Sequence, residues 1–148
     1  MSASYLRAVV CVSLLWASCA LSQDPIAEAL ATFREYDSRA ARFDSSLADL
    51  YSDDALISTK RAGAAGDREL SFKGDKWKTM IRLGMPLAKL RGDTNRFENV
   101  SARQVGGDVV ITAQRYSVLK AYWSPFTLVL RKRPDAWRIV EERSETRP

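Results

Sequence analysis

The hydrophobic pattern of the segment that follows Asp24 is that of amphipathic helices. Apolar side chains recur every three or four residues and charged residues fill the positions between them, so an apolar stripe has a charged back. Asp24 followed by Pro25 is a typical helix start, and Asp44 offers a second N-cap farther along. We therefore predict two helices, over about residues 25–42 and 44–51, which meet at a bend.

The rest of the chain predicts one more helix among strands. Apolar runs bounded by turn residues predict strands over residues 55–58, 70–72, 96–105, 109–119, 126–131 and 137–145. Residues 76–83 predict a helix that Gly84-Met85-Pro86 breaks, with one further turn to Leu90. Helices followed by an antiparallel meander indicate the α+β class. We expect N-terminal helices packed on a curved antiparallel sheet, which together form a cone whose open mouth suits a ligand.

Residues 1–22 have the layout of a secretory signal peptide. Arg7 precedes a short apolar run, and small residues end the segment before the first acid, Asp24. Cleavage after Ala20 and cleavage after Ser22 both satisfy the small-residue rule. The run is shorter than the ~20 apolar residues of a membrane span, so we expect export and no stable membrane span after cleavage.

Both cysteines of the chain, Cys11 and Cys19, lie inside this segment. The remaining domain, residues 23–148, therefore has no disulfide, which fits a bacterial periplasm better than a small eukaryotic secreted domain. An uncleaved anchor and a lipoprotein with its lipid on Cys19 are the alternatives. The lipoprotein alternative is weak because Trp16 stands where a small aliphatic residue is needed.

Composition and charge exclude several kinds of site. The chain is 46% hydrophobic and 28% charged, which is typical of a globular domain. It has no His, so Ser-His-Asp and Cys-His catalysis and His-ligated zinc are excluded, and we expect no cofactor or metal site. The net charge of +5 falls to +4 when Arg7 is removed. The basic run Arg131–Arg133 lies at a predicted hairpin turn, where charges are ordinarily solvated, so we expect no nucleic-acid partner.

Three segments carry a family resemblance: Asp44–Ile57, Gly107–Ile111 and Trp137–Val140. With the order of predicted elements, they resemble the nuclear transport factor 2-like superfamily over nearly all of residues 23–148. That superfamily includes SnoaL-like polyketide cyclases, ketosteroid isomerases, scytalone dehydratases and many exported proteins without an assigned role. The resemblance implies the cone-shaped, cystatin-like fold. These segments specify packing, so for function the resemblance is only an analogy.

The catalytic set of the ketosteroid isomerases can be compared with this chain residue by residue. Asp53–Ala55 resembles the step that precedes their catalytic aspartate by five residues, and that position is Thr59 here, which cannot act as a base at neutral pH. Tyr36 is the nearest equivalent of their oxyanion-binding tyrosine. No second acid stands in Ser124–Leu130. The cyclases and dehydratases usually rely on His, so we predict no catalytic residue.

Seven residues are our candidates for lining a ligand pocket, because aromatic rings stack on flat ligands and charged groups orient them. They are Tyr36, Tyr51, Asp54, Trp77, Arg115, Tyr116 and Trp123. The alternative for the aromatic residues is a place in the core or at its rim. The alternative for Asp54, with Asp49 and Asp53 close by, is a solvated or capping role.

Arg115 alternates with Ile111 in a predicted strand and would lie among apolar neighbours on a concave face. A partly buried arginine requires an anionic partner. Glu141 has the strand parity of Trp137 and Ile139, so we expect an Arg115–Glu141 salt bridge, with an anionic ligand as the alternative.

We therefore expect an exported domain that binds a small ligand or a partner and has no clear catalytic machinery. One alternative is a lyase- or isomerase-type enzyme that uses Tyr36 with Asp54 or another carboxylate, which requires two polar groups converging in one cavity. The other is a module that dimerises through the outer face of its sheet.

Overall fold

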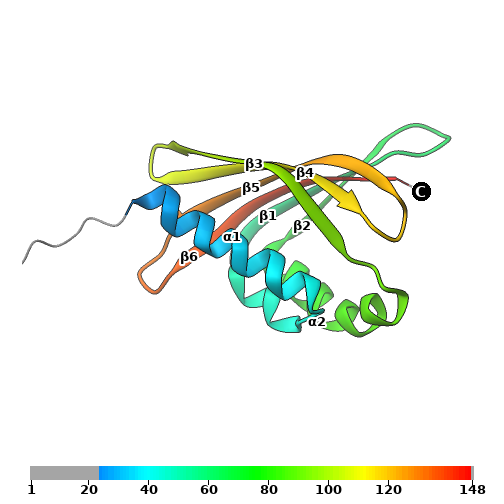
Figure 1. Cartoon of the computed structure of the whole chain (residues 1–148), viewed down its shortest axis with the longest axis horizontal. Helices are drawn as coiled ribbons and strands as arrows, with labels where there is room; N and C mark the ends of the chain where they lie inside the picture. Colours follow the sequence, from blue (N-terminus) through cyan, green and yellow to red (C-terminus); the bar gives the residue numbers. More distant parts are fainter. Residues whose placement is uncertain (1–23, 148) are drawn as a thin grey trace, which may run out of the picture.

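The computed structural model describes residues 24–147 (Figure 1), and the predicted signal peptide lies outside them. The elements are α1 (Pro25–Ala41), the 3₁₀ helix η1 (Ser45–Leu50), β1 (Tyr51–Arg61), β2 (Arg68–Lys73), α2 (Gly74–Arg91), β3 (Asn95–Val105), β4 (Asp108–Ser117), β5 (Tyr122–Lys132) and β6 (Trp137–Thr146). The predicted α+β class is confirmed.

The first two helices begin as their sequence predicts. An Asp24 carboxylate oxygen accepts a hydrogen bond from the Ile26 N–H at 3.0 Å, and Pro25 occupies the first turn of α1. Asp44 caps η1 in the same way by accepting from the Ser46 N–H at 2.9 Å. The apolar stripe of α1 is its buried face.

The predicted break in the next helix is wrong. α2 continues through Pro86 to Arg91, and Gly92, in the left-handed conformation at φ 64°, ends it. The N–H groups of Gly92 and Asp93 then donate to carbonyls of the last turn, at 3.2 and 2.9 Å. A proline removes only one helical hydrogen bond, and this half of α2 is exposed, so the helix can bend there without disturbing neighbours.

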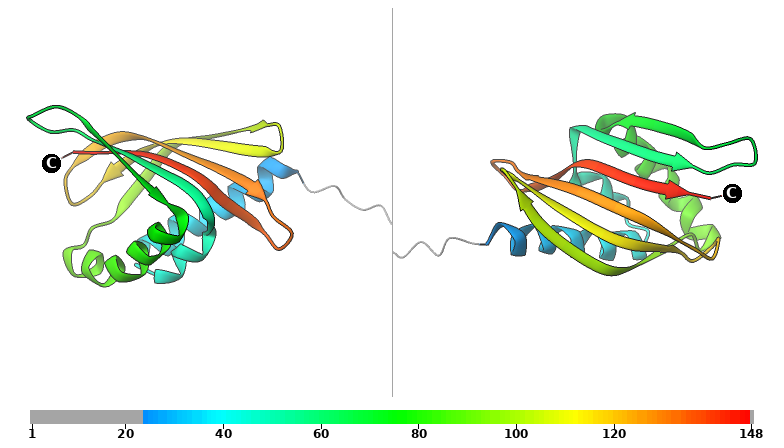
Figure 2. Two further views of the ribbon diagram at one scale, coloured as in Figure 1. Left: turned by 180° about the vertical axis from the view of Figure 1, so that it is seen from behind. Right: turned by 90° about the horizontal axis from the view of Figure 1, so that it is seen from above.

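The six strands form one sheet in the order β2-β1-β6-β5-β4-β3, which can be followed in the right view of Figure 2. The predicted antiparallel meander is present from β3 to β6. The β1–β2 hairpin joins it through a parallel β1–β6 pair, which sequence reasoning did not predict. β1 and β5 are also longer than the predicted strands over residues 55–58 and 126–131.

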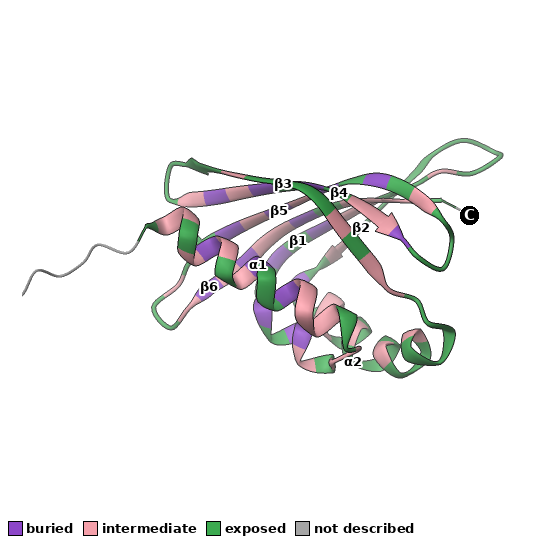
Figure 3. Cartoon of the chain, viewed as in Figure 1, coloured by how far each residue is buried: buried purple, intermediate pink, exposed green. Residues whose placement is uncertain are grey.

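α1 lies along the concave side of the sheet, and the core forms between them (Figures 1 and 3). Phe33 and Tyr36 of α1 meet Phe97 of β3 and Phe126 of β5, with ring centroids 5.0 to 6.2 Å apart. α2 packs on η1 and β1. The far half of α2 is exposed, with Leu90 at 83% exposure. Aromatic side chains therefore fill the middle of the concave side.

β6 contains a bulge that changes which of its residues face inward. Val129 of β5 pairs with Glu141, but the next residue, Leu130, pairs with Ile139, so Val140 is the extra residue. The alternation that buries Trp137 and Ile139 resumes one position later and buries Glu142, which is 4% exposed.

Candidate functional site

A pocket of about 350 Å³ opens at the end of the concave side where β1 and β6 finish and β5 begins. We call this pocket the mouth. Its lining residues come from the ends of β1, β3, β4, β5 and β6 and from the segments that adjoin them: Arg61, Asp93, Asn95, Arg115, Ser117, Lys120, Tyr122, Thr146 and Arg147. The lining carries four cations and one carboxylate, so the mouth is electropositive.

Strand register explains why these residues meet. Arg61 of β1 pairs with Thr146 of β6, and Ser124 of β5 pairs with Arg115 of β4. Paired residues in neighbouring strands point to the same face of a sheet. A row of two cations and two hydroxyls therefore crosses the concave face just inside the mouth.

Arg115 forms the floor of the mouth and is half-buried. Its Nη2 donates to the backbone carbonyl of Glu145, and its Cζ lies 6.0 Å from the ring centroid of Phe126. Its Nε is buried and has no hydrogen-bond partner among residues 24–147. Leaving a buried charged donor unpaired costs free energy, so this N–H is poised for an acceptor.

The expected Arg115–Glu141 salt bridge is wrong. Because of the bulge at Val140, Glu141 points to the outer face and pairs with Arg143 at 2.6 Å. Over the described part of the chain, Arg115 makes no ion pair within 4.0 Å. The anionic partner that a half-buried arginine requires is therefore not supplied by the residues described.

Two hydroxyls on the concave face are also buried without partners. Ser124 is 1% exposed and Thr59, one row deeper on β1, is half-buried, and neither hydroxyl oxygen has a hydrogen-bond partner among residues 24–147. A buried polar atom without a partner is uncommon in folded proteins and calls for an explanation. Ser124 is not itself a lining residue of the mouth, but it pairs directly with Arg115, so a polar ligand bound beside Arg115 would supply a partner for its hydroxyl.

Behind the floor lies a buried polar pair. The Tyr51 hydroxyl donates to a carboxylate oxygen of Glu142. Burial raises the pKa of Glu142, although the Tyr51 hydrogen bond and the Arg115 charge oppose that rise. Burial and the nearby Glu142 charge also raise the pKa values of the Tyr36 and Tyr51 phenols well above their ordinary value. Both phenols are therefore neutral donors at physiological pH.

The structure separates the seven predicted pocket residues into five places. Arg115 lines the mouth, and Tyr36 and Tyr51 lie in the core behind it. Trp77 packs on Phe72, with ring centroids 5.7 Å apart, and its indole N–H makes no hydrogen bond among the described residues, although it lies close enough to lower the pKa of Tyr51.

The remaining three predicted residues lie away from the concave side. Tyr116 and Trp123 pair across β4 and β5, with ring centroids 5.0 Å apart. They occupy the outer face because each neighbours an inward residue, Arg115 and Ser124. The side chain of Asp54 is 70% exposed and pairs with Arg133 at 3.0 Å, so it does not converge with Tyr36.

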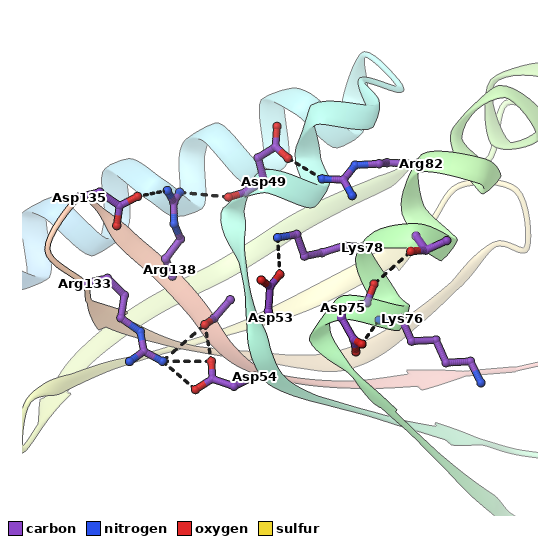
Figure 4. A network of polar contacts seen from close by, with 12 residues as sticks. Asp49, Asp53, Asp54, Asp75, Lys76, Lys78, Arg82, Arg133, Asp135 and Arg138 are labelled. Carbon is purple, nitrogen blue, oxygen red and sulfur yellow. Dashed lines mark hydrogen bonds and ion pairs between the residues drawn. The ribbon is translucent and has the colours of Figure 1, made fainter.

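Asp54 belongs to a charged surface that we call the ion-pair network (Figure 4). In it η1 and the start of β1 are joined to α2 by the pairs Asp49–Arg82 and Asp53–Lys78 and to the β5–β6 turn by Asp54–Arg133. Arg138, which pairs with Asp135 of the same turn, also donates to the Asp49 carbonyl at 3.0 Å. Lys78 lowers the pKa of Asp53, chiefly by donating a hydrogen bond. Each cation of the network already has a carboxylate, so its role is to hold these elements together.

Comparisons with solved structures identify the fold of the chain. No protein-family model and no curated protein match the chain. It is similar to a nuclear transport factor 2-like protein of unknown function from Shewanella oneidensis, with a TM-score of 0.61, 14% identity and coverage of 83% of this chain and 100% of that one. A protein of unknown function from Pectobacterium atrosepticum gives a TM-score of 0.60 and 20% identity, and covers 83% and 91%. A proposed dehydratase from Streptomyces avermitilis gives 0.60 and 16%, and covers 81% and 94%.

The chain has the nuclear transport factor 2-like fold. The predicted resemblance is confirmed at that level. In this chain the fold gathers Arg115, Ser124, Tyr51 and Glu142 on the concave side, and sequence reasoning found two of these four as site candidates. No pattern in the sequence around Ser124 marks it as a site residue. Glu142 was missed because the bulge shifts the inward–outward alternation of β6 by one residue.

Within residues 24–147, no helix is long and apolar enough to cross a membrane, and no cluster of three or more Cys, Asp or Glu side chains could hold a metal ion.

Proposed function

We propose that this protein binds a small molecule in the mouth, with the ligand seated against Arg115. One observation carries the proposal: a half-buried guanidinium forms the floor of an open pocket, and both its Nε and the adjacent Ser124 hydroxyl are buried without partners. A volume of about 350 Å³ is at the small end of ligand pockets. The ligand is therefore a small metabolite rather than a large cofactor or a peptide.

The test is a thermal-shift screen of a metabolite library on residues 23–148, repeated on the variant Thr146→Trp. Thr146 lines the mouth and is half-buried, so a larger ring there fills the pocket with little disturbance of the core. Compounds that raise the melting temperature of the wild type should lose that effect in the variant. A library that stabilises neither protein, or both equally, would contradict the proposal.

A second candidate is a lyase- or isomerase-type reaction, which the Tyr51–Glu142 pair supports. A buried carboxyl group whose pKa is raised by burial is a stronger base for removing a proton from carbon than an ordinary carboxylate. Its low exposure speaks for a structural role instead. Incubation of each bound compound in D₂O separates the two, because a reaction would exchange a C–H for C–D in the wild type and not in Glu142→Gln.

We further propose export, with residues 1–22 removed and the domain acting in the periplasm. N-terminal sequencing of the protein from fractionated cells tests this, since a mature chain should begin at Leu21 or Gln23.

A homodimer through the outer face of the sheet is the partner we propose. Trp123 is 39% exposed there and packs on Tyr116. Light scattering that finds only monomers at high concentration would contradict it.

A further inference from the structure

We propose that the ligand of the mouth is a small carboxylic acid, whose carboxylate is held between Arg115 and Ser124 at the floor. This inference rests on the proposed binding function and names the chemical class of its ligand. It follows from which donors are free, how deep they lie and which charges surround them.

The free donors match the two oxygens of one carboxylate. The Arg115 Nε–H and the Ser124 hydroxyl belong to residues that pair directly across β4 and β5. A guanidinium edge and a hydroxyl side by side can satisfy both oxygens of a planar carboxylate with charge-assisted hydrogen bonds. A phosphate dianion would need more buried donors than these two to offset its desolvation.

The charges around the floor favour an anion, because four cations of the lining face the single carboxylate of Asp93. Among residues 24–147 the Arg61 side chain makes no hydrogen bond or ion pair, and the Lys120 side chain donates only to the Arg147 carbonyl, at 3.3 Å. Arg147 alone among the cations of the lining has a carboxylate, that of Glu145 at 3.2 Å. The rim therefore steers anions inward and helps to hold them.

Glu142 is the buried carboxyl group behind Arg115, and its position explains why Arg115 has no internal ion-pair partner among the described residues. The carboxyl group lies two rows deeper than Arg115 on the concave face, close enough for Arg115 to influence its titration. The Tyr51 hydroxyl and burial hold Glu142 in place, so it cannot swing towards the mouth to pair with the guanidinium. No carboxylate of the described residues therefore occupies the buried Nε–H of Arg115, and this donor is left for a carboxylate that enters through the mouth.

The body of the acid would lie towards Tyr122, whose ring forms a wall of the mouth. The Arg147 guanidinium carbon lies 5.6 Å from the centroid of that ring. An aromatic or short aliphatic body fits between this wall and the rim, whereas a long chain would meet the aromatic core formed by Phe97 and Phe126.

The experiment compares matched acids and amides by titration calorimetry at low salt on residues 23–148. The probes are benzoate with benzamide, succinate with succinamide, and inorganic phosphate. We expect at least one acid to bind more than tenfold more tightly than its amide, since charge-assisted hydrogen bonds are lost in the amide. Phosphate should bind more weakly than that acid.

Three variants locate the site. Arg115→Met should weaken binding of the acid roughly ten- to hundredfold, and Ser124→Ala by a smaller factor, whereas Arg115→Lys should recover part of the loss. The matched control is Arg131→Met, which removes an equal charge far from the mouth and should leave affinity unchanged. Circular dichroism identifies any variant that does not fold. If Arg115→Met does not fold, the affinities of Arg115→Lys and Ser124→Ala decide the test.

The outcomes separate the class of ligand from the proposed function. Equal binding of acids and amides in the mouth would overturn the carboxylate inference and leave small-molecule binding intact, as would tighter binding of phosphate than of any acid. Loss of acid binding in Arg131→Met but not in Arg115→Met would also overturn it. If neither acids nor amides bind, the inference fails together with the proposed function.

Discussion

Two arginines on neighbouring strands have opposite surroundings. Near the β3–β4 turn, Nε and Nη2 of Arg131 on β5 meet both carboxylate oxygens of Asp108, at 2.7 and 2.8 Å. That geometry is a bidentate ion pair. At the other end of the sheet, Arg115 on β4 donates to one backbone carbonyl, and its Nε has no partner among residues 24–147.

The same contrast holds for the surfaces around these two residues. The ion-pair network and the Arg131–Asp108 pair match each cation with a carboxylate, and Arg131 lowers the pKa of Asp108 by its hydrogen bonds. The mouth gathers cations and offers one lining carboxylate, Asp93. One end of the molecule is thus built for cohesion, while the other keeps donors free at a cost in stability, as binding sites commonly do.

The largest effect we predict concerns the anchoring of α2 beside the ion-pair network. In Gly74→Ala, the new Cβ would stand 2.0 Å from the Ser52 carbonyl oxygen and 2.9 Å from the Ala55 nitrogen, both backbone atoms that cannot yield cheaply. We expect a loss of about 3 kcal/mol in the free energy of unfolding. Chemical denaturation followed by tryptophan fluorescence measures it.

The matched control is the second glycine inside the same helix. Gly84→Ala meets no atom within 4 Å, in the exposed half of α2 that leads to the mouth. Alanine there should stabilise the protein by about 0.5–1 kcal/mol through helix propensity. Equal losses in both variants would show that α2 is no more anchored at one end than at the other.

Local features of this fold were predictable, because neighbouring residues determine them. The stripe of α1, the caps at Asp24 and Asp44, and the β3–β4 and β5–β6 hairpin turns all depend on residues a few positions apart. The continuation of α2 past Pro86 was missed because the Gly92 cap and the solvent around that half outweigh one lost hydrogen bond.

The site was harder to predict, because it depends on long-range pairing. The inward–outward alternation of side chains along β4 predicts that Arg115 lies on the concave face. The same alternation excludes Tyr116 from that face, so proposing both residues for one pocket was inconsistent. Glu142 required knowledge of the bulge at Val140, which only the pairing with β5 reveals. A one-residue shift exchanges every inward side chain for an outward one, so Glu141 was chosen in place of Glu142.

The second prediction concerns the buried pair behind the mouth. Glu142 is an acid whose pKa is raised in the folded state by burial, so the folded protein binds a proton more tightly than the unfolded chain does. The stabilisation that this proton binding adds to the free energy of unfolding is fully present below the ordinary pKa of 4.5 and is lost as pH rises through the raised pKa. Each pKa unit of the rise corresponds to about 1.4 kcal/mol.

Glu142→Gln should therefore remove this decrease of the unfolding free energy with pH above 4.5. Tyr51→Phe should enlarge it, because the lost hydrogen bond no longer opposes the effect of burial on the pKa of Glu142. Urea titrations at a series of pH values check both. Identical pH profiles for the wild type and Glu142→Gln would show that the carboxyl group is not held away from water.

The smallest predicted effect compares the charges of the two ends directly. Arg131→Gln breaks a bidentate pair on the surface and should lower the melting temperature by about 2 °C at low salt. Arg61→Gln removes a cation that lies with Arg115 in the mouth, and relief of like-charge repulsion should raise the melting temperature slightly. Both changes should fade above about 0.5 M salt, because screening removes interactions between exposed charges. Changes of the same sign at low salt would mean that the mouth is as well compensated as the opposite end, and Arg115 would then have no need of an external anion.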